Sequence, residues 1–450
     1  MGVTAAVRNA PTPQAHGRDT PRRRKCLQVG ETGRVEVARG LTPGGRPYNP
    51  GSPRMPAPVP AQTGSFDVAV VGTGVVGLAA ALGCTQQGLR VALIGPVPRL
   101  RVPTVEAPFD PRIYALAGAS IRLLEDLRAW PQVDRGRTQP VARMQVEGDR
   151  GGSLSFDAYA AAVDRLATIV EECELLRALW IARGFASALS HLDDSFEALE
   201  VGAGTARVRL TGGRTIESRL VLGADGRNSA VRAAAGFNAI ETPHRQTALV
   251  ANFACAQAHR GVAHQWFTDE GVVALLPLPG QRVSLVWSAP QELAAELLAL
   301  GTTELAARVA ARTQGRLGAL TQSGEAHGFV LCDLQVERIV AERLALVGDA
   351  AHVVHPLAGQ GLNLGLQDVA QLLKVLSARE AWRDPGDLVL LRRHERARAE
   401  PVGLMRFTVN SLARLFGTRD PAIRWLRNQG LNWVQAMPLL KSLLIRQAVG

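Results

Sequence analysis

The most regular hydrophobic pattern in the chain lies near its first quarter. A valine-rich run, Phe66–Val71, is followed by a glycine-rich turn, and small and apolar residues then continue over Leu78–Gln87. A second run rich in Val and Ile, Arg90–Ile94, follows at once. Short β-branched runs bounded by turn residues are typical of buried strands, and the segment between them has the length of a helix. The pattern therefore predicts a strand–helix–strand unit, although its overall hydropathy resembles that of a membrane span.

Two later apolar runs each end in a turn that contains an aspartate. Arg219–Gly223 leads into Asp225-Gly226, and Leu344–Val347 leads into Gly348-Asp349. A glycine-rich turn then opens a helix over about Gly361–Leu376, in which leucines recur at helical spacing. Because ligands bind at the carboxyl ends of strands in open parallel sheets, both aspartates fall where a ligand is expected.

The middle of the chain has the pattern of antiparallel strands. Thr247–Ala254 is predicted to form a strand, and Val272–Leu278 and Arg282–Ser288 flank the turn Pro279-Gly280-Gln281, which predicts a hairpin. An earlier hairpin near Val141–Phe156 is expected to join the same sheet.

The composition is that of an ordinary globular protein, with 450 residues of which 46% are hydrophobic and 20% charged. This length predicts about two to three domains. The five cysteines are scattered along the chain: Cys26, Cys84, Cys173, Cys255 and Cys332. Their spacing argues against a disulfide scaffold, a zinc ribbon and a locally bound iron–sulfur cluster, and it indicates a reducing compartment.

The net charge of +11 is concentrated in the first 65 residues, which contain ten basic and three acidic side chains and ten of the 26 prolines. Such a segment cannot bury enough apolar surface to fold, so we expect residues 1–64 to be disordered and expect no nucleic-acid partner. The segment lacks the apolar region of a secretory signal, has Ala6 where a myristoylation signal has Ser or Thr, and carries prolines that interrupt a transit helix. A basic tail that contacts anionic lipid and a translation start near Met55 both stay open.

Gly72, Gly74 and Gly77 have the spacing of a dinucleotide-binding turn between a strand and a helix. The first glycine permits the tight turn, the second lets the backbone approach a pyrophosphate, and the third lets the helix pack closely. The acidic residue that such folds place on the ribose is absent, because Gly95 stands at that position. The nearby Arg99 makes an NADP-binding domain the alternative at this point.

Three segments carry a resemblance to a known family: the glycine motif at Gly72–Gly77, the turn at Asp225-Gly226 and the turn at Gly348-Asp349. In order and spacing, they resemble the group A flavin monooxygenases, which have the fold of p-hydroxybenzoate hydroxylase. More narrowly, the chain resembles the ubiquinone-biosynthesis hydroxylases over about residues 66–445. The other residues that match this family are Asp110, Arg112, Ala115, Leu116, the following helix to Leu124, Pro277, Val283–Trp287 and Lys441. The resemblance favours FAD over NADP as the bound nucleotide.

The resemblance implies a mixed α/β fold, in part α+β, with a Rossmann-type FAD-binding domain, an antiparallel-sheet substrate domain and a C-terminal helical region. The expected boundaries are 65–236 with 338–385 for the discontinuous FAD-binding domain, 237–337 with the hairpin near 141–156 for the substrate sheet, and 386–450 for the helices. Those helices are expected to pack on the core or to meet a membrane or a partner.

By the same resemblance, the first glycine motif and Asp225-Gly226 would lie at the FAD pyrophosphate, Asp349 would bind a ribityl hydroxyl, and Arg112 would lie along the flavin. The helix that begins near Gly361 would direct its N-terminus at the flavin N1/C2 carbonyl, which stabilises reduced flavin. The full expected cofactor-binding set is Gly72, Gly74, Gly77, Arg112, Asp225, Gly226, Gly348, Asp349, Pro356, Gly359, Gly361 and Asn363.

The function that the resemblance implies is hydroxylation of an aromatic ring by dioxygen through a flavin C4a-hydroperoxide. The substrate would be a lipophilic aromatic molecule, a polyprenylated phenol or benzoquinol precursor of ubiquinone, with NAD(P)H or a small redox protein as electron donor. Trp266 and Trp287 are candidates to stack on the ring, although tryptophans at strand spacing also suit a core. No catalytic side chain stands out, and His352 and His355 lack a further ligand cluster, so no metal is expected.

Several alternatives share this fold. A halogenase is disfavoured because its Trp-x-Trp motif is missing, whereas another phenol hydroxylase, a prenyl reductase and a non-catalytic flavoprotein subunit of a quinone-biosynthesis complex stay open. We expect a cytoplasmic protein whose contact with the inner face of a membrane is at most peripheral.

Overall fold

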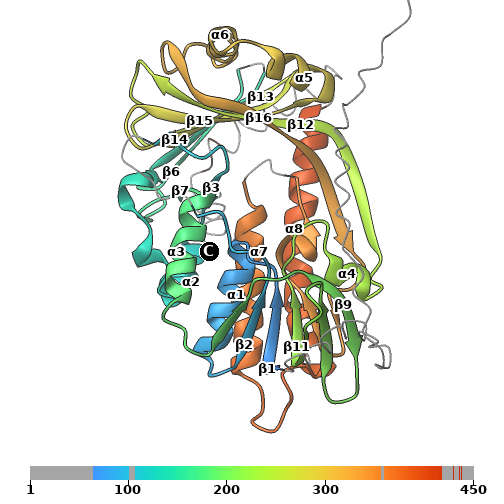
Figure 1. The fold of residues 1–450 in the computed structure, drawn as a ribbon. Coiled ribbons are helices and arrows are strands. Elements are labelled where there is room, and N and C mark those ends of the chain that lie inside the picture. The colour runs from blue at the N-terminus through green and yellow to red at the C-terminus, as the bar shows by residue number, and fades with distance from the viewer. Residues whose placement is uncertain are drawn as a thin grey trace, which may run out of the picture. The chain divides into compact units, whose positions relative to one another are not determined.

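The computed structural model describes residues 64–100, 107–149, 151–355 and 359–417, together with Gln429, Gln435 and Met437. The disorder expected for residues 1–64 falls outside this part of the chain except at Gly64, which is not disordered but begins the first strand. Nearly all of the helical prediction beyond residue 417 also falls outside it. Within the described residues, three sheets and the helices that cover them are arranged as Figure 1 shows.

The first sheet has a parallel centre. Its strands are β1 (Gly64–Val71), β2 (Val91–Ile94), β8 (Leu189–Leu192), β9 (Phe196–Val201), β10 (Ala206–Leu210), β11 (Thr215–Gly223), β17 (Val340–Ala341) and β18 (Leu344–Leu346). Their order is β17-β18-β11-β1-β2-β8, and β10 and β9 extend from β11. Because β2, β1, β11 and β18 run parallel, their carboxyl ends meet along one edge of the sheet. The glycine-rich turn of the predicted strand–helix–strand unit and both acidic turns lie at this edge.

Four helices cover one face of this sheet through a shared apolar core: α1 (Val75–Gln86), α3 (Glu172–Arg183), α7 (Gly361–Ser377) and α8 (Leu388–Gly417). The opposite face packs on the short helix α4 (Ala230–Ala234) and the β9–β10 hairpin. Helix α1 begins three residues earlier than the hydrophobic pattern indicates. The reason is Gly77, whose missing side chain lets the first helical turn lie directly against the backbone of Gly72.

The second sheet is mainly antiparallel. In spatial order its strands are β19 (His352–Val353), β16 (Leu320–Val336), β12 (Ala239–Cys255), β15 (Arg282–Pro290), β14 (Gly271–Leu278), β13 (Val262–Thr268), β5 (Arg143–Glu147) and β6 (Ser153–Asp157). The predicted hairpin is β14–β15, and the early hairpin β5–β6 joins the sheet through parallel pairing of β5 with β13. Helices α5 (Gln291–Ala299) and α6 (Thr302–Arg312) pack on its outer face, as Figure 1 shows.

A small third sheet and its neighbours form a wall beside the other two. Its strands are β3 (Ile113–Leu116), β7 (Ala167–Glu171) and β4 (Gln139–Val141), and helix α2 (Gly118–Asp126) follows β3. A buried ion pair between Arg137 and Glu171, with 2.5 Å between Nε and Oε2, holds this wall together. The other carboxylate oxygen of Glu171 accepts the backbone N–H of Asp110, so the pair also fixes the segment that leads into β3.

Three buried histidines make the stability of the fold sensitive to acid. Burial lowers the pKa of His264, His355 and His394 to about 4, whereas histidine in an unfolded chain titrates near 6.5. Between these values the unfolded chain binds more protons than the folded one, so stability falls as the pH drops from about 6.5 to 4. We expect each histidine to contribute a loss on the order of 1–2 kcal/mol between pH 7 and pH 5. Denaturant titrations at the two pH values check this, and equal unfolding free energies would contradict it.

Candidate active site

A cavity of about 1290 Å³ lies between the carboxyl edge of the first sheet and the inner face of the second. Its lower part is lined by the ends of β1 and β2, the turn after β11 and the turn after β18. Its upper part is lined by β12 to β16, and its side by β3 and β7. A drug-sized ligand occupies roughly 300–1,000 Å³, so this cavity has room for more than one molecule of that size.

The three glycines of the first motif have different tasks. Gly72 has φ +119°, and a Cβ there would stand 2.2 Å from the carbonyl oxygen of Ala224. A Cβ on Gly77 would stand 2.0 Å from the carbonyl oxygen of Gly72, so these two glycines are required by packing. A Cβ on Gly74 would meet no atom within 4 Å, because this residue faces the cavity. Gly74 therefore leaves space for a ligand.

Two long helices begin at the cavity without a side-chain cap. Gly74 is the N-cap of α1 and Gln360 is the N-cap of α7, and neither provides a side-chain cap to the backbone N–H groups of its helix. Both residues line the cavity, as do Gly359 and Gly361. The uncapped N–H groups and the helix dipoles favour negative charge at both places. The cavity thus has two places that favour negatively charged groups.

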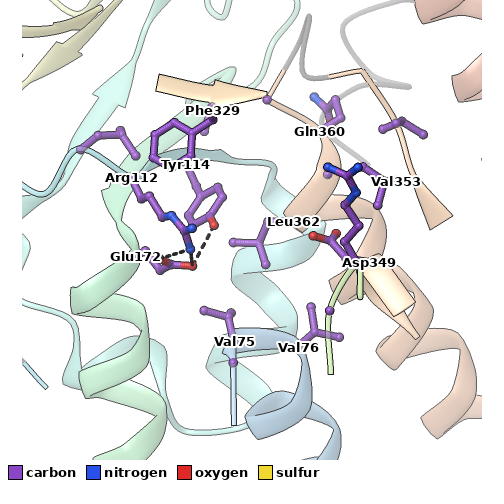
Figure 2. Close-up of a pocket in the computed structure, with 18 of the residues that line it drawn as sticks. Val75, Val76, Arg112, Tyr114, Glu172, Phe329, Asp349, Val353, Gln360 and Leu362 are labelled. Atoms are coloured by element: carbon purple, nitrogen blue, oxygen red, sulfur yellow. Dashed lines mark hydrogen bonds and ion pairs between the residues drawn. The ribbon is translucent and has the colours of Figure 1, made fainter. Parts of the chain in front are cut away.

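The two predicted aspartates differ in what their carboxylates do. Asp225 accepts hydrogen bonds from Ser229 Oγ (2.5 Å) and from the backbone N–H of Val231 (3.1 Å), so its carboxylate holds the start of α4. Asp349 instead points into the cavity, as Figure 2 shows, and among the described residues its carboxylate has no hydrogen-bond partner. Asp349 is accessible from the cavity, but desolvation by the surrounding protein raises its pKa, with Glu172 adding to the increase and His352 opposing it. A ligand hydroxyl that donates to Asp349 would relieve this desolvation.

Arg112 forms a polar cluster with Glu172 and Tyr114 on another wall of the cavity. Arg112 Nη1 lies 3.1 Å from Glu172 Oε2, and the hydroxyl of Tyr114 donates to Glu172 Oε1 at 3.0 Å. Figure 2 shows these three side chains directed toward one another. Burial and the nearby Glu172 carboxylate raise the pKa of Tyr114, so it is a neutral donor. Arg112 also lies over the ring of Phe329, at 5.4 Å from the ring centroid.

Some expected cofactor contacts do not reach the cavity. Gly77 and Gly348 serve backbone packing behind it, and neither lines it. Asn363 is buried: its side-chain oxygen accepts from the N–H of Ala117 (2.9 Å), and its amide donates to the carbonyl of Ala115 (2.9 Å). These bonds tie α7 to the β3–α2 turn, and the cofactor contact expected of Asn363 stays a prediction. Pro356 lies outside the described residues.

Of the two interpretations of Trp266 and Trp287, the structure supports a place in the core and not stacking on a substrate. Both side chains are buried on the outer face of the second sheet, among apolar residues of α5 and α6. Successive residues of a strand face opposite sides, so the neighbours of these tryptophans face the cavity instead. The residues of β12–β15 that line it are Ala248, Val250, Ala263, Gln265, Val272, Ala274, Leu276, Val286 and Ser288. Strand alternation was the signal that could have identified this set.

Gly95, which replaces the expected ribose-binding acid, has φ +147°. A Cβ at Gly95 would stand 3.0 Å from the side chain of Thr73, whose hydroxyl donates to the carbonyl of Pro96 (2.7 Å). A larger residue is therefore disfavoured at Gly95 by both conformation and space. Ser195 and Phe196 also line the cavity.

Comparison with known proteins agrees with this geometry. Residues 65–403 match the family model of the FAD binding domain. The chain is 36% identical to the ubiquinone hydroxylase UbiL of Rhodospirillum rubrum over 85% of this chain and 89% of that protein. It is an FAD-dependent monooxygenase of the ubiquinone-biosynthesis hydroxylase family.

Two further comparisons place this monooxygenase among its relatives. It is 33% identical to the 3-demethoxyubiquinol 3-hydroxylase of Escherichia coli, over 85% of this chain and 98% of that protein. The crystal structure of Pseudomonas aeruginosa PqsL in complex with 2-aminobenzoylacetate has a TM-score of 0.68 and 27% identity, over 82% of this chain and 99% of that one. The chain therefore shares its fold with this solved structure over most of both chains.

The residues of the cavity fit FAD. At Gly74, Gly226 and Gly361 a Cβ would meet no protein atom within 4 Å, so bare backbone faces the cavity where a long ligand must pass closely. The two uncapped helices supply N–H groups, and Asp349 supplies an acceptor for a hydroxyl. Among the described residues of this monooxygenase, no helix combines the length and the apolar character needed to cross a membrane.

Proposed function

We propose that FAD binds along the carboxyl edge of the first sheet. The backbone of Gly72 and Gly74 and the start of α1 hold the pyrophosphate, and Asp349 accepts a hydrogen bond from a ribityl hydroxyl. The start of α7, at Gly361, lies against the flavin ring and favours negative charge on its pyrimidine end. Arg112 lies along the flavin, held in place by Glu172. The support is that these groups line one continuous cavity.

The Asp349 contact leads to a quantitative expectation. Asp349→Ala removes an acceptor that is charged in the complex, and such hydrogen bonds contribute about 1.5–3 kcal/mol. FAD affinity should therefore fall roughly ten- to a hundredfold, with little change in the stability of the apoprotein. Titration of the apoprotein with FAD, followed by flavin fluorescence, measures the affinity. A thermal melt of the apoprotein measures its stability. An unchanged FAD affinity would show that Asp349 has no such contact.

We further propose that the enzyme hydroxylates the ring of a lipophilic phenol or benzoquinol intermediate of ubiquinone biosynthesis. The observation that carries this proposal is the inner face of the second sheet. Of the nine side chains that β12–β15 turn to the cavity, seven are apolar and two, Gln265 and Ser288, are neutral polar groups. None of the nine ionises, so this chamber suits a hydrophobic ring and excludes water. A prenyl tail would add about 0.8 kcal/mol of binding for each buried CH₂.

In this arrangement FAD and the protein have different tasks. When bound and reduced, FAD supplies the activation of dioxygen, with NAD(P)H or a small redox protein as the electron donor. The protein orients the ring, keeps water out of the upper chamber and stabilises charge on the flavin at the start of α7. The names of the bacterial relatives, a ubiquinone hydroxylase and a 3-demethoxyubiquinol 3-hydroxylase, support this substrate class.

A gene deletion tests the proposal. The strain without this protein should accumulate a prenylated quinone precursor that lacks one ring hydroxyl, and mass spectrometry of lipid extracts identifies it. Complementation with the Asp349→Ala variant should restore less quinone than complementation with the unaltered gene. A deletion strain with an unchanged quinone profile would exclude a role in ubiquinone biosynthesis.

A further inference from the structure

A buried hydrogen-bonded cluster of polar and charged side chains lies directly behind the turn that carries Asp349. Its members are Asp368 on α7, His352 on β19 and Arg398 on α8. The carboxylate of Asp368 is 2.8 Å from His352 Nε2 through one oxygen and 2.6 Å from Arg398 Nε through the other. Asp368 is 1% exposed, and neither partner is more than 7% exposed. Burying three such groups together is costly unless each is paired.

The same carboxylate also holds the backbone of the aspartate turn. Asp368 Oδ2 accepts the N–H of Gly348 at 2.9 Å. Gly348 opens the short 3-10 turn η3 (Gly348–Ala350), in which Asp349 is the next residue. Gly348 has φ +61°, a conformation that costs other residues free energy. The carboxylate of Asp368 thus holds the turn at both ends. It accepts the N–H of Gly348, and it also bonds to His352, two residues after the turn.

The packing around the turn leaves little freedom. A Cβ at Gly365 on α7 would stand 3.2 Å from the Cα of Gly348 and 2.8 Å from the side chain of Val76 on α1. Helices α1 and α7 therefore meet at Gly348, and their N-termini face the cavity on either side of it. A shift of the turn would move the Asp349 carboxylate relative to both helix ends.

We propose that Asp368 is a positioning residue for FAD: it fixes the turn of Asp349 so that the carboxylate reaches the ribityl chain. This inference rests on the proposed contact of Asp349 with FAD. Asp368 acts only through Asp349 and does not itself touch the ligand, because it does not line the cavity. A role confined to joining α7 and α8 would affect stability but not the contribution of Asp349.

The ionised state of Asp368 is essential to this role. Burial alone would raise the pKa of Asp368, but His352, Arg398 and the N–H of Gly348 hold it below the usual value. An asparagine at this position has a single side-chain oxygen. The positive charge of Arg398 would attract that oxygen, and the amide NH₂ would then face the N–H of Gly348. Asp368→Asn should therefore displace the turn while keeping the volume of the side chain.

A double-mutant cycle on FAD affinity tests the inference. Apoproteins of the unaltered chain, Asp349→Ala, Asp368→Asn and the double variant are titrated with FAD, and their thermal midpoints are measured in parallel. We expect Asp368→Asn alone to weaken FAD binding roughly tenfold or more, and to change affinity by less than about threefold when Asp349 is already alanine. Equal losses in both backgrounds would overturn the inference.

A control and a second variant make the result independent of folding. Asp384 is the matched control, because it accepts from Arg343 (3.0 Å), Arg219 (2.9 Å) and the N–H of Gly386 (2.7 Å) away from the cavity. Asp384→Asn should lower the thermal midpoint and leave FAD affinity unchanged. If Asp368→Asn does not fold, His352→Gln replaces it in the double-mutant cycle. The expected loss of FAD affinity is again roughly tenfold or more alone and less than about threefold when Asp349 is alanine. If Asp349→Ala itself has no effect on affinity, the proposed contact fails and the inference fails with it.

Discussion

Gly74→Val should give a folded protein without flavin colour. Gly74 has φ −72°, which valine adopts without strain, and its Cβ position is free of protein atoms. The added side chain would occupy space that the proposed pyrophosphate site needs. Overlap of this kind costs on the order of 1–3 kcal/mol or more, so FAD affinity should fall roughly ten- to a hundredfold or beyond. Absorbance of the purified protein and its circular dichroism spectrum measure the two parts of this expectation.

The matched control is Gly77→Val, only three residues away. A Cβ on Gly77 would overlap the carbonyl oxygen of Gly72, at 2.0 Å, so this variant should lose stability whether or not FAD is present. Comparing the two variants therefore distinguishes a glycine that leaves space for a ligand from a glycine that is required by packing. A Gly74→Val protein that retains FAD with unchanged affinity would contradict the proposed position of the pyrophosphate.

Ala274→Phe should abolish ring hydroxylation while leaving FAD bound. Ala274 lies on β14 between Gln265 and Val286 of the neighbouring strands, and all three line the upper cavity. A phenyl group there would fill the chamber that the proposed ring occupies. Loss of near-attack geometry by about 1 Å reduces turnover on the order of a hundredfold, and full exclusion reduces it further. Product formation from a prenylated phenol and the FAD content of the same sample are the quantities to measure.

Trp287→Phe provides the control for this second expectation. Trp287 is completely buried on the outer face of the same sheet, so the change should lower thermal stability without altering substrate preference. A change in substrate preference with Trp287→Phe, or unchanged ring hydroxylation by Ala274→Phe, would place the substrate chamber elsewhere.

The sequence predicted the features that depend on local pattern. The strands β1, β2 and β14–β15 and the turns at Asp225 and Asp349 follow from short-range signals, and the structure has all of them. Which face of a strand meets the cavity depends on how two sheets pack, so the sequence left two interpretations of Trp266 and Trp287 open. The bonds of Asn363 to β3 and α2, and of Asp368 to Arg398, join residues that are distant in sequence or on different helices. No local pattern reports such pairings.

Isotope labelling of the product tests the central claim most directly. The purified enzyme with FAD, a reductant and a prenylated phenol is incubated under ¹⁸O₂, and the quinol product is analysed by mass spectrometry. A monooxygenase that hydroxylates the ring in this chamber should place one ¹⁸O atom in the new hydroxyl group, with no label from H₂¹⁸O. Reductant consumption that yields only hydrogen peroxide, or a product whose new oxygen comes from water, would contradict the account.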